Sequence, residues 1–254
     1  MNLTPPAFMT PSFFGVSDAE KFWRGVDLIV ESMPESRGIF ASDNLFAFQR
    51  SLGFMRDGPL VSAYQAHCET VAEKGALWRL VTLAWAARSA APLDGDFVEC
   101  GCYRGTTARV LCDLVEFTGN IRRRYYLYDL FEHDASMPHH AMPDHGPGLT
   151  AQVRARFANL PNVVITEGRV PDSLAIAAPD KIAFMHLDLN NADAEIGALE
   201  VLFDRVVPGG IVVLDDFGWL GYERQRIAEV EWFGARKYQI LELPTGQGVV
   251  VKRG

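Results

Sequence analysis

Residues 97–111, FVECGCYRGTTARVL, place two cysteines and two glycines in one short segment that could carry redox, metal or nucleotide chemistry. Cys100 and Cys102 are separated by a single residue, so they are not the Cys-x-x-Cys pair of redox proteins. Two thiolates also supply only half of a structural zinc site, and the sequence has no second close cysteine pair to complete it. We therefore interpret both cysteines as small residues that pack near a ligand, with a metal or redox role as the alternative.

The two glycines of this segment lie where a predicted strand gives way to a predicted helix. DFVECG is apolar enough for a buried strand that ends at Gly101, and TTARVLCDLVEF begins a helix directly after Gly105. The first-turn amides of such a helix carry partial positive charge and attract polar or anionic ligands. Glycine has no β-carbon, so a ligand can approach the backbone closely. The segment therefore predicts a nucleotide-binding turn.

Acidic residues end three further predicted strands. Asp129 follows RYYLY, Asp188 follows KIAFMHL, and Asp215 and Asp216 follow GGIVVL. Ligands of parallel sheets gather at the carboxyl ends of strands, where Asp129 could accept hydrogen bonds from ribose hydroxyls. Converging carboxylates repel unless a cation neutralises them, and all-oxygen ligation favours a hard ion such as Mg²⁺. Helix capping, by Asp216 or by Asp193, is the alternative interpretation.

Residues 131–148, FEHDASMPHHAMPDHGPG, contain four of the six histidines of the chain, namely His133, His139, His140 and His145. The segment follows the second predicted strand and so begins at the ligand edge of the sheet. We expect it to fold over the site as a lid, with His139 or His140 facing the reacting group as a base. A zinc site and a solvated, proline-broken loop are the alternatives.

These residues need a sheet to bring them together. Strand-like runs, among them NVVITEG at 162–168, alternate with helical segments from residue 96 onward, which predicts βαβ units and a parallel sheet of about seven strands. The end, KYQILELPTGQGVVVKRG, predicts an antiparallel hairpin because the turn between its two strands is too short for a crossover. Residues 17–90 show helical spacing without a strand-like run. We therefore expect an α/β protein with a helical N-terminal cap, residues 1–92, and a ligand-binding domain, residues 93–254.

Composition limits the partners. The chain has 254 residues, 32 acidic and 24 basic, for a net charge of −8, which argues against nucleic acid and anionic membrane surfaces as partners. No apolar run is long enough to cross a bilayer, and the N-terminus lacks the pattern of a secretory signal. Four cysteines without framework spacing suit a reducing compartment. We expect a cytoplasmic protein that acts on a small molecule; whether it forms a homo-oligomer stays open.

Taken in order, several of these segments resemble one enzyme family. DFVECGCYRGTTARVL, YYLYDLFE, GRVPDSL, HLD and LFDRVVPGGIVVLDDFGWLGYERQ are similar to the macrocin O-methyltransferase-like family of S-adenosylmethionine (SAM) enzymes. The resemblance extends from about residue 96 to the C-terminus. It implies a class I methyltransferase fold, with six parallel strands and a seventh inserted antiparallel. It also implies Mg²⁺-assisted methylation of hydroxyls on sugars of natural products.

The resemblance also implies roles for individual residues. Glu99, Gly101, Cys102, Tyr103, Gly105, Thr106 and Thr107 would line the methionine end of SAM, Asp129 the ribose, and Gly168 and Arg169 the adenine. Asp188, Asp215 and Asp216 would hold the metal. The chain departs from the family at one place, because LDLNNA stands where LDVDLY is common. An amide cannot serve as a base, so Asn190 leaves that role to Asp188 or to a loop histidine.

Two other classes stay open at this point. An NAD(P)-dependent oxidoreductase would share the first strand, glycine turn and helix, although the sequence has no Tyr-x-x-x-Lys signature of hydride transfer. A non-catalytic SAM-binding or interaction protein would keep the fold without the chemistry, and the LDLNNA departure allows it.

Overall fold

The computed structural model describes residues 7–33, 38–119, 122–133 and 142–254. The chain divides into two compact units, Met1–Val81 and Thr82–Gly254, and the division falls within helix α4 (Leu77–Ala90). The predicted boundary, between residues 92 and 93, lies just beyond the end of this helix and stays a prediction. None of the helices in the described parts of the chain is both long enough and apolar enough to span a membrane.

The first unit is not purely helical, so the expectation that residues 17–90 contain no strand is wrong. A small sheet of order β1-β2-β3 accompanies its helices. Its elements are β1 (Phe8–Met9), α1 (Ala19–Glu31), β2 (Phe40–Ser42), β3 (Leu45–Ala47), α2 (Gly58–His67) and α3 (Val71–Gly75). These strands have two or three residues, too few to show alternation. Asp43 and Asn44, both with positive φ, form the turn between β2 and β3, which is the conformation of a type I′ hairpin.

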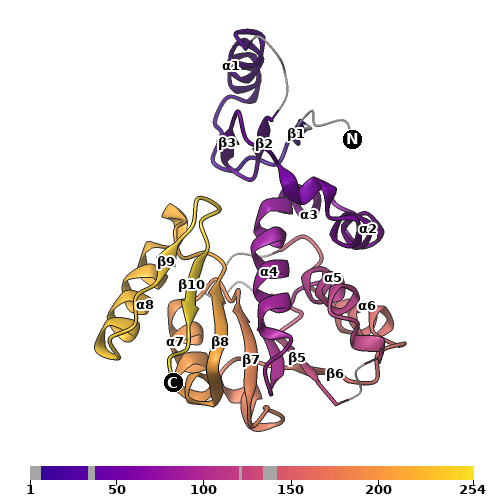
Figure 1. Ribbon diagram of the computed structural model, residues 1–254, viewed down its shortest axis with the longest axis vertical. Coiled ribbons are helices and arrows are strands. Elements are labelled where there is room, and N and C mark those ends of the chain that lie inside the picture. Colours follow the sequence, from indigo (N-terminus) through magenta and orange to yellow (C-terminus); the bar gives the residue numbers. More distant parts are fainter. Residues whose placement is uncertain (1–6, 34–37, 120–121, 134–141) are drawn as a thin grey trace. The chain divides into compact units, whose positions relative to one another are not determined.

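The second unit contains the predicted seven-stranded sheet (Figure 1). Its order is β6-β5-β4-β7-β8-β10-β9, and every described pairing is parallel except those of β10, which runs antiparallel to both neighbours. The strands are β4 (Asp96–Cys100), β5 (Tyr125–Asp129), β6 (Val163–Glu167), β7 (Ile182–Leu187), β8 (Val206–Leu214), β9 (Leu241–Glu242) and β10 (Gly248–Val251). The inserted antiparallel strand and the terminal hairpin are therefore confirmed.

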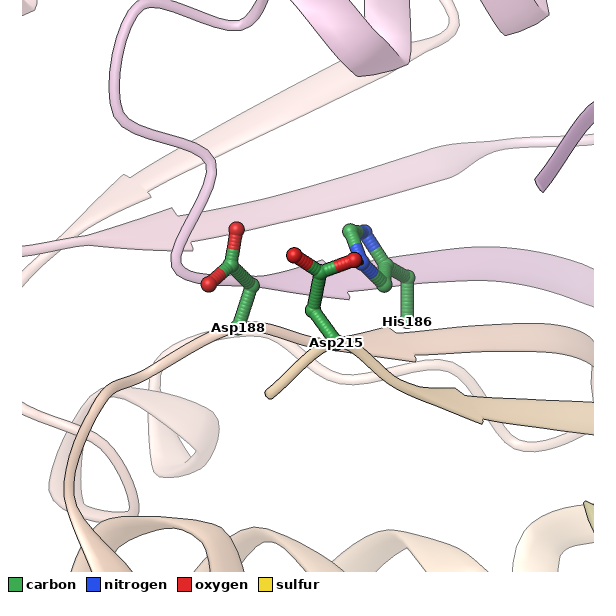
Figure 2. A group of neighbouring side chains, drawn as sticks. All are labelled: His186, Asp188 and Asp215. Atoms are coloured by element: carbon green, nitrogen blue, oxygen red, sulfur yellow. The ribbon is translucent and has the colours of Figure 1, made fainter. Parts of the chain in front are cut away.

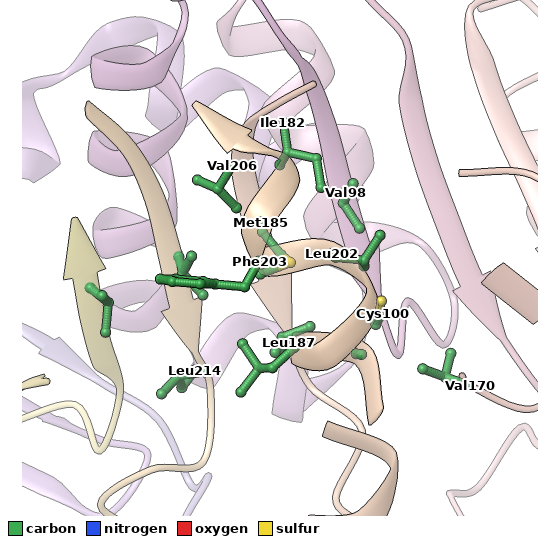
Figure 3. Packing of buried hydrophobic residues seen from close by; sticks show 14 of the residues in the cluster. Val98, Cys100, Val170, Ile182, Met185, Leu187, Leu202, Phe203, Val206 and Leu214 are labelled. Atoms are coloured by element: carbon green, nitrogen blue, oxygen red, sulfur yellow. The ribbon is translucent and has the colours of Figure 1, made fainter. Parts of the chain in front are cut away.

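Side chains alternate along these strands, so each strand contributes to two faces of the sheet. Val98, Met185 and Val212 belong to a buried hydrophobic cluster that α7 (Ala192–Leu202) and α8 (Glu223–Ala235) complete with residues such as Leu199 and Phe233 (Figure 3). The residues that alternate with Val98, Met185 and Val212 along their strands point to the opposite face of the sheet. The helices α5 (Thr106–Leu114) and α6 (Leu149–Arg156) complete the βαβ units on the β5–β6 side of the sheet.

The carboxyl ends of β4 and β7 approach each other so closely that only glycine fits between them. Gly101 has φ +88°, and a β-carbon at this position would lie 1.8 Å from the carbonyl oxygen of Asp188. The amide of Asp188 donates to the carbonyl oxygen of Cys100 at 2.8 Å, which fixes the two ends together. Gly105, with φ +71°, likewise leaves space for the ring of Phe157. Both glycines are therefore required by the packing of the protein itself, not only by ligand approach as the sequence suggested.

Two carboxylic acids face each other between α7 and α8. Glu195 and Glu229 are both buried, and the amide of Leu189 donates to one oxygen of Glu195 at 3.1 Å. Burial and the neighbouring charge of Glu229 raise the pKa of Glu195 well above its usual range. Burial also raises the pKa of Glu229 to about 7, with Asp216 acting in the same direction and Glu195 against it. The pair is therefore stable when it retains a proton.

Replacing Gly101 by alanine should destabilise the protein, because the added β-carbon meets the Asp188 carbonyl and the backbone has positive φ. We expect the free energy of unfolding to fall by about 2–4 kcal/mol in a urea titration. Gly234→Ala is the matched control, since an added β-carbon there meets no heavy atom of the described residues within 4 Å. Equal stability of the two variants would contradict the close approach of β4 and β7.

Replacing Glu229 by glutamine should flatten the pH dependence of stability. The pKa is about 7 in the folded protein against an ordinary 4.5, so protonation of Glu229 stabilises the fold at low pH. That contribution is lost as the pH rises through about 7. Urea unfolding at about pH 5.5 and about pH 8 should show a larger loss in wild type than in Glu229→Gln. The exposed Glu231→Gln on the same helix should behave as wild type; identical slopes in all three would rule out a protonated Glu229.

Candidate functional site

The residues that follow β4, β6, β7 and β8 are each hydrogen-bonded to a neighbouring strand, so the strand ends form one continuous edge. The amide of Gly101 donates to Tyr128 at 2.8 Å, that of Asp215 to Leu187 at 2.9 Å, and that of Gly168 to Asp129 at 2.9 Å, each bond reaching a carbonyl oxygen. The predicted residues of the described chain, from Glu99 to Asp216, therefore lie along the carboxyl ends of β4 to β8. This is the edge at which parallel sheets bind ligands.

The glycine turn leads into α5 without a side-chain cap. Gly105 is the N-cap residue of α5 and adopts the left-handed conformation, so the N-cap residue supplies no side-chain hydrogen bond to the first helical turn. Those amides, with Thr106 buried and Thr107 half-buried, remain the positive end of the helix beside the turn. The local structure is the strand, tight turn and helix that the sequence predicted.

Asp129 ties the turn to the next loop. Its Oδ2 accepts from the amide of Tyr103 at 2.6 Å, and its Oδ1 accepts from the amide of Phe131 at 2.7 Å. Both donors have positive φ, +47° and +58°, so the carboxylate holds two unusual backbone conformations. The carboxylate of Asp129 therefore positions the glycine turn and the start of the loop after β5.

Part of the histidine-rich segment is docked on the glycine turn. The hydroxyl of Tyr103 accepts from the amide of Asp144 at 2.8 Å, and the guanidinium of Arg104 donates to the Asp144 carboxylate at 3.0 Å. The ring of His145 lies edge-on to Tyr103, with centroids 5.3 Å apart. His139 and His140 lie outside the described residues, so their catalytic role, the lid and the zinc alternative stay predictions.

Gly168 and Arg169, predicted near adenine, follow β6 at the outer part of the edge. Gly168 has φ +143° and donates to the end of β5, while Arg169 is exposed. The four cysteines of the chain, Cys68, Cys100, Cys102 and Cys112, are free and buried. Burial, reinforced by nearby acids such as Asp129, raises the pKa of Cys102 well above its usual range, and burial does the same for Cys100. This favours their interpretation as packing residues, since the thiolate is the reactive form.

Three side chains at the ends of β7 and β8 come within reach of a single metal ion. His186, Asp188 and Asp215 each offer a ligand atom, and these atoms lie within 4.8 Å of one another (Figure 2). Asp216, the third predicted ligand, is not part of this group in the described residues. It acts on the pKa of Glu229, which places it toward α8. The chain turns at residues 215–218, directly after β8, and this turn separates the side chains of Asp215 and Asp216.

His186 lies between two buried carboxylates. Its Nδ1 is 3.2 Å from Oε1 of Glu99, and its Nε2 is 3.3 Å from Oδ1 of Asp215. Burial alone would lower the pKa of His186, but hydrogen bonds to Asp215 and Glu99 outweigh it and hold the pKa well above its ordinary 6.5. Each ring nitrogen therefore faces a carboxylate oxygen, and both sides of the imidazole are engaged within the protein. Asp188 and Asp215 are then the members of the group with lone pairs suited to a metal.

Glu99 lies deeper than the sequence suggested. The hydroxyl of Tyr125 donates to its Oε2 at 3.2 Å, and His186 occupies its Oε1. Its carboxylate is buried within the sheet face, so its predicted contact with SAM stays a prediction. Sequence reasoning missed His186, although one signal was available. His186 precedes Asp188 by two residues, and residues two apart on a strand share a face.

The comparisons with known proteins agree with this geometry. The macrocin-O-methyltransferase (TylF) family matches residues 79–237. A protein of Streptomyces olivaceus, 8-demethyl-8-(2,3-dimethoxy-alpha-L-rhamnosyl)-tetracenomycin-C 4'-O-methyltransferase, is 30% identical over 140 residues, which are 49% of this chain and 54% of that protein. The chain thus spans about half the length of this curated relative.

Solved structures show the same fold. The O-methyltransferase NovP superposes with a TM-score of 0.62 and 18% identity, over 75% of this chain and 88% of that one. Apo CalS11, a TDP-rhamnose 3'-O-methyltransferase of calicheamicin biosynthesis, superposes with a TM-score of 0.56 and 16% identity, over 94% of this chain and 96% of its own. The predicted class I SAM-methyltransferase fold is confirmed. Because the family match includes more than half of its residues, the chain belongs to the macrocin-O-methyltransferase (TylF) family.

Proposed function

We propose that the protein is a SAM-dependent O-methyltransferase that methylates a hydroxyl group of a sugar, free or attached to a natural product. The observation that carries the proposal is the pairing of Asp188 and Asp215 at the strand ends, beside the glycine turn of a TylF-family chain. The printed activities of the relatives point to the acceptor class, since the Streptomyces protein acts on a rhamnosylated tetracenomycin and CalS11 on TDP-rhamnose.

The cofactor would lie along the edge formed by β4, β5 and β6. The first turn of α5, which follows the glycine turn, offers backbone amides to its methionine end, and the carboxylate of Asp129 would accept hydrogen bonds from the ribose hydroxyls. Gly168 would let the adenine approach the backbone after β6. Bound there, SAM supplies a methyl group on a positively charged sulfur, ready for displacement by an oxygen nucleophile.

The residues of the chain then have to orient the acceptor hydroxyl and remove its proton. Methyl transfer from SAM bound there would join the hydroxyl oxygen to the methyl carbon and leave the electron pair of the broken bond on sulfur, while the hydroxyl proton would pass to a carboxylate of the chain. Asp188 is the candidate base, because it lies in the group at the end of β7. Asp215 would hold the acceptor beside it. Fixing both partners at van der Waals contact lowers the entropic part of the barrier.

The departure at Asn190 has a structural explanation that supports this assignment. Asn190 has φ +54°, a left-handed conformation that asparagine tolerates better than most residues. Asn191 is the N-cap of α7 and accepts from the amide of Ala194 at 2.9 Å. Both amides therefore shape the loop, and the carboxylate that remains for proton transfer on this loop is Asp188. Asp193, the capping candidate of the sequence, does not serve as the N-cap.

The site also fits the Mg²⁺ that the family implies. Asp188 and Asp215 offer hard oxygen ligands within 4.8 Å of each other, and the imidazole of His186 is engaged by Glu99 and Asp215. Asp188 and Asp215 would hold the ion, and Asp216 as a further ligand stays a prediction. A bound cation would lower the pKa of the acceptor hydroxyl.

Removing the carboxylate of Asp129 should weaken cofactor binding. We expect Asp129→Ala to lose about 1.5–3 kcal/mol of affinity for S-adenosylhomocysteine, the range for a hydrogen bond to a charged group. Isothermal titration calorimetry measures the loss. Asp204→Ala, an exposed carboxylate far along the chain, is the control and should bind as wild type. Unchanged affinity of Asp129→Ala would remove this residue from the cofactor site.

Turnover tests the reaction itself. TDP-rhamnose and a panel of rhamnosylated natural products, incubated with SAM, should give S-adenosylhomocysteine and methylated sugar. Asp215→Asn should lower kcat by about 100-fold or more while leaving SAM affinity within about threefold, because it removes charge at the reacting hydroxyl and not at the cofactor. Excess EDTA should act on wild type in the same way, and Mg²⁺ should restore activity. Full activity in EDTA would exclude the cation and leave both acids as direct contacts of the acceptor.

A further inference from the structure

Gln247 reaches the candidate site from the C-terminal hairpin. It immediately precedes β10 and is completely buried. Its Nε2 donates to Oδ1 of Asp215 at 2.8 Å, and its Oε1 accepts from the hydroxyl of Thr245 at 3.0 Å. Both functional atoms of the amide are therefore used. Gln247 therefore directs an uncharged hydrogen-bond donor at one oxygen of the Asp215 carboxylate.

The backbone holds this amide rigidly. The amide of Leu243 donates to the carbonyl of Gln247 at 2.8 Å, which closes the hairpin turn. The amide of Gly218 donates to the carbonyl of Gly246 at 2.7 Å, which joins the turn to the segment after β8. A β-carbon on Gly246 would lie 2.3 Å from Nε1 of Trp219, so the turn and this segment are in close contact. Gln247 and Asp215 are thus attached to one rigid piece of backbone.

Asp215 receives a second donor on the same oxygen. Nε2 of His186 lies 3.3 Å from Oδ1, the atom that Gln247 also contacts. Glu99 holds His186 from its other side, and Tyr125 holds Glu99. A row of buried hydrogen bonds therefore crosses the sheet from β5 through β4 and β7 to the end of β8, and Gln247 completes it at the hairpin. Both bonds to Asp215 therefore act on Oδ1 of its carboxylate.

We propose that Gln247 and His186 are positioning residues that hold the carboxylate of Asp215, through its Oδ1, in its orientation beside Asp188 for the reacting hydroxyl. The proposal rests on the function proposed above. In Figure 2 the carboxylates of Asp188 and Asp215 lie next to each other, and the ring of His186 lies on the other side of Asp215. Two neighbouring carboxylates repel and would turn apart. Two directional donors on one oxygen oppose that rotation, and a misplacement of about 1 Å can cost about 100-fold in rate.

The terminal hairpin thereby has a role in the chemistry, which substitution of Gln247 tests. Gln247→Leu removes the donor at nearly constant volume, and Gln225→Leu makes the same change at a second buried glutamine. The side-chain amide of Gln225 has no hydrogen-bond partner among the described residues, which makes it a matched control. Crystal structures of wild type and both variants with S-adenosylhomocysteine show the position of the Asp215 carboxylate. They can be determined without knowing the acceptor. The Asp215 carboxylate should turn from its wild-type position in Gln247→Leu and keep it in Gln225→Leu.

Kinetics complete the test on an acceptor that turns over in wild type. Gln247→Leu should lower kcat about 10- to 100-fold with affinity for S-adenosylhomocysteine within about threefold, whereas Gln225→Leu should stay within about twofold of wild type in both. His186, the second positioning residue, is tested in the same way. His186→Gln should retain more activity than His186→Leu, because the glutamine amide can replace the Nε2 donor. If Gln247→Leu does not fold, Gln247→Met takes its place.

The results separate this proposal from the proposed function. An unmoved Asp215 in Gln247→Leu, or a moved Asp215 with full kcat, overturns the positioning role. A parallel loss of kcat and cofactor affinity does so too, because it indicates a general structural defect. If no acceptor is methylated by wild type, the proposed function fails, and the crystal structures alone decide whether Gln247 positions Asp215.

Discussion

A histidine held between two buried carboxylates is the interaction around which the rest of the site is arranged. Glu99, His186 and Asp215 are all buried, and charges in a protein interior are tolerated only when they are paired and hydrogen-bonded. The strand register meets this requirement, since Glu99 on β4 lies directly opposite His186 on β7. Asp215 follows β8, the next strand. Glu99, His186 and Asp215 therefore follow one another across the sheet in the order of their strands, β4, β7 and β8.

The sequence was sufficient to predict the edge at which the site forms. Asp129, Asp188 and Asp215 each follow a strand-like run, and parallel strands with helical crossovers must bring such positions to one edge. The short turn PTGQ likewise required an antiparallel hairpin, because it cannot contain a crossover. These inferences rest on local patterns and on the geometry of βαβ units. Neither requires knowledge of how the side chains pack.

Other features depend on contacts between distant segments and could not be read locally. His186 stands within an apolar run, and only its partners Glu99 and Asp215 give it a role. Gln247 lies in a turn whose residues show no reactive pattern, and it meets Asp215 from 32 positions away in the chain. The carboxyl pair Glu195 and Glu229 forms only where α7 packs against α8. The small N-terminal sheet was missed because its strands are too short to alternate.

The proposed chemistry requires that SAM binds at the ends of β4 to β6 with its methyl group beside Asp188 and Asp215. A crystal structure with S-adenosylhomocysteine tests this directly. The ribose should lie against Asp129, and the sulfur, which marks the former place of the methyl group, should lie on the side of Asp188 and Asp215. Adenosine bound at another edge of the sheet, or a sulfur turned away from both aspartates, would contradict it.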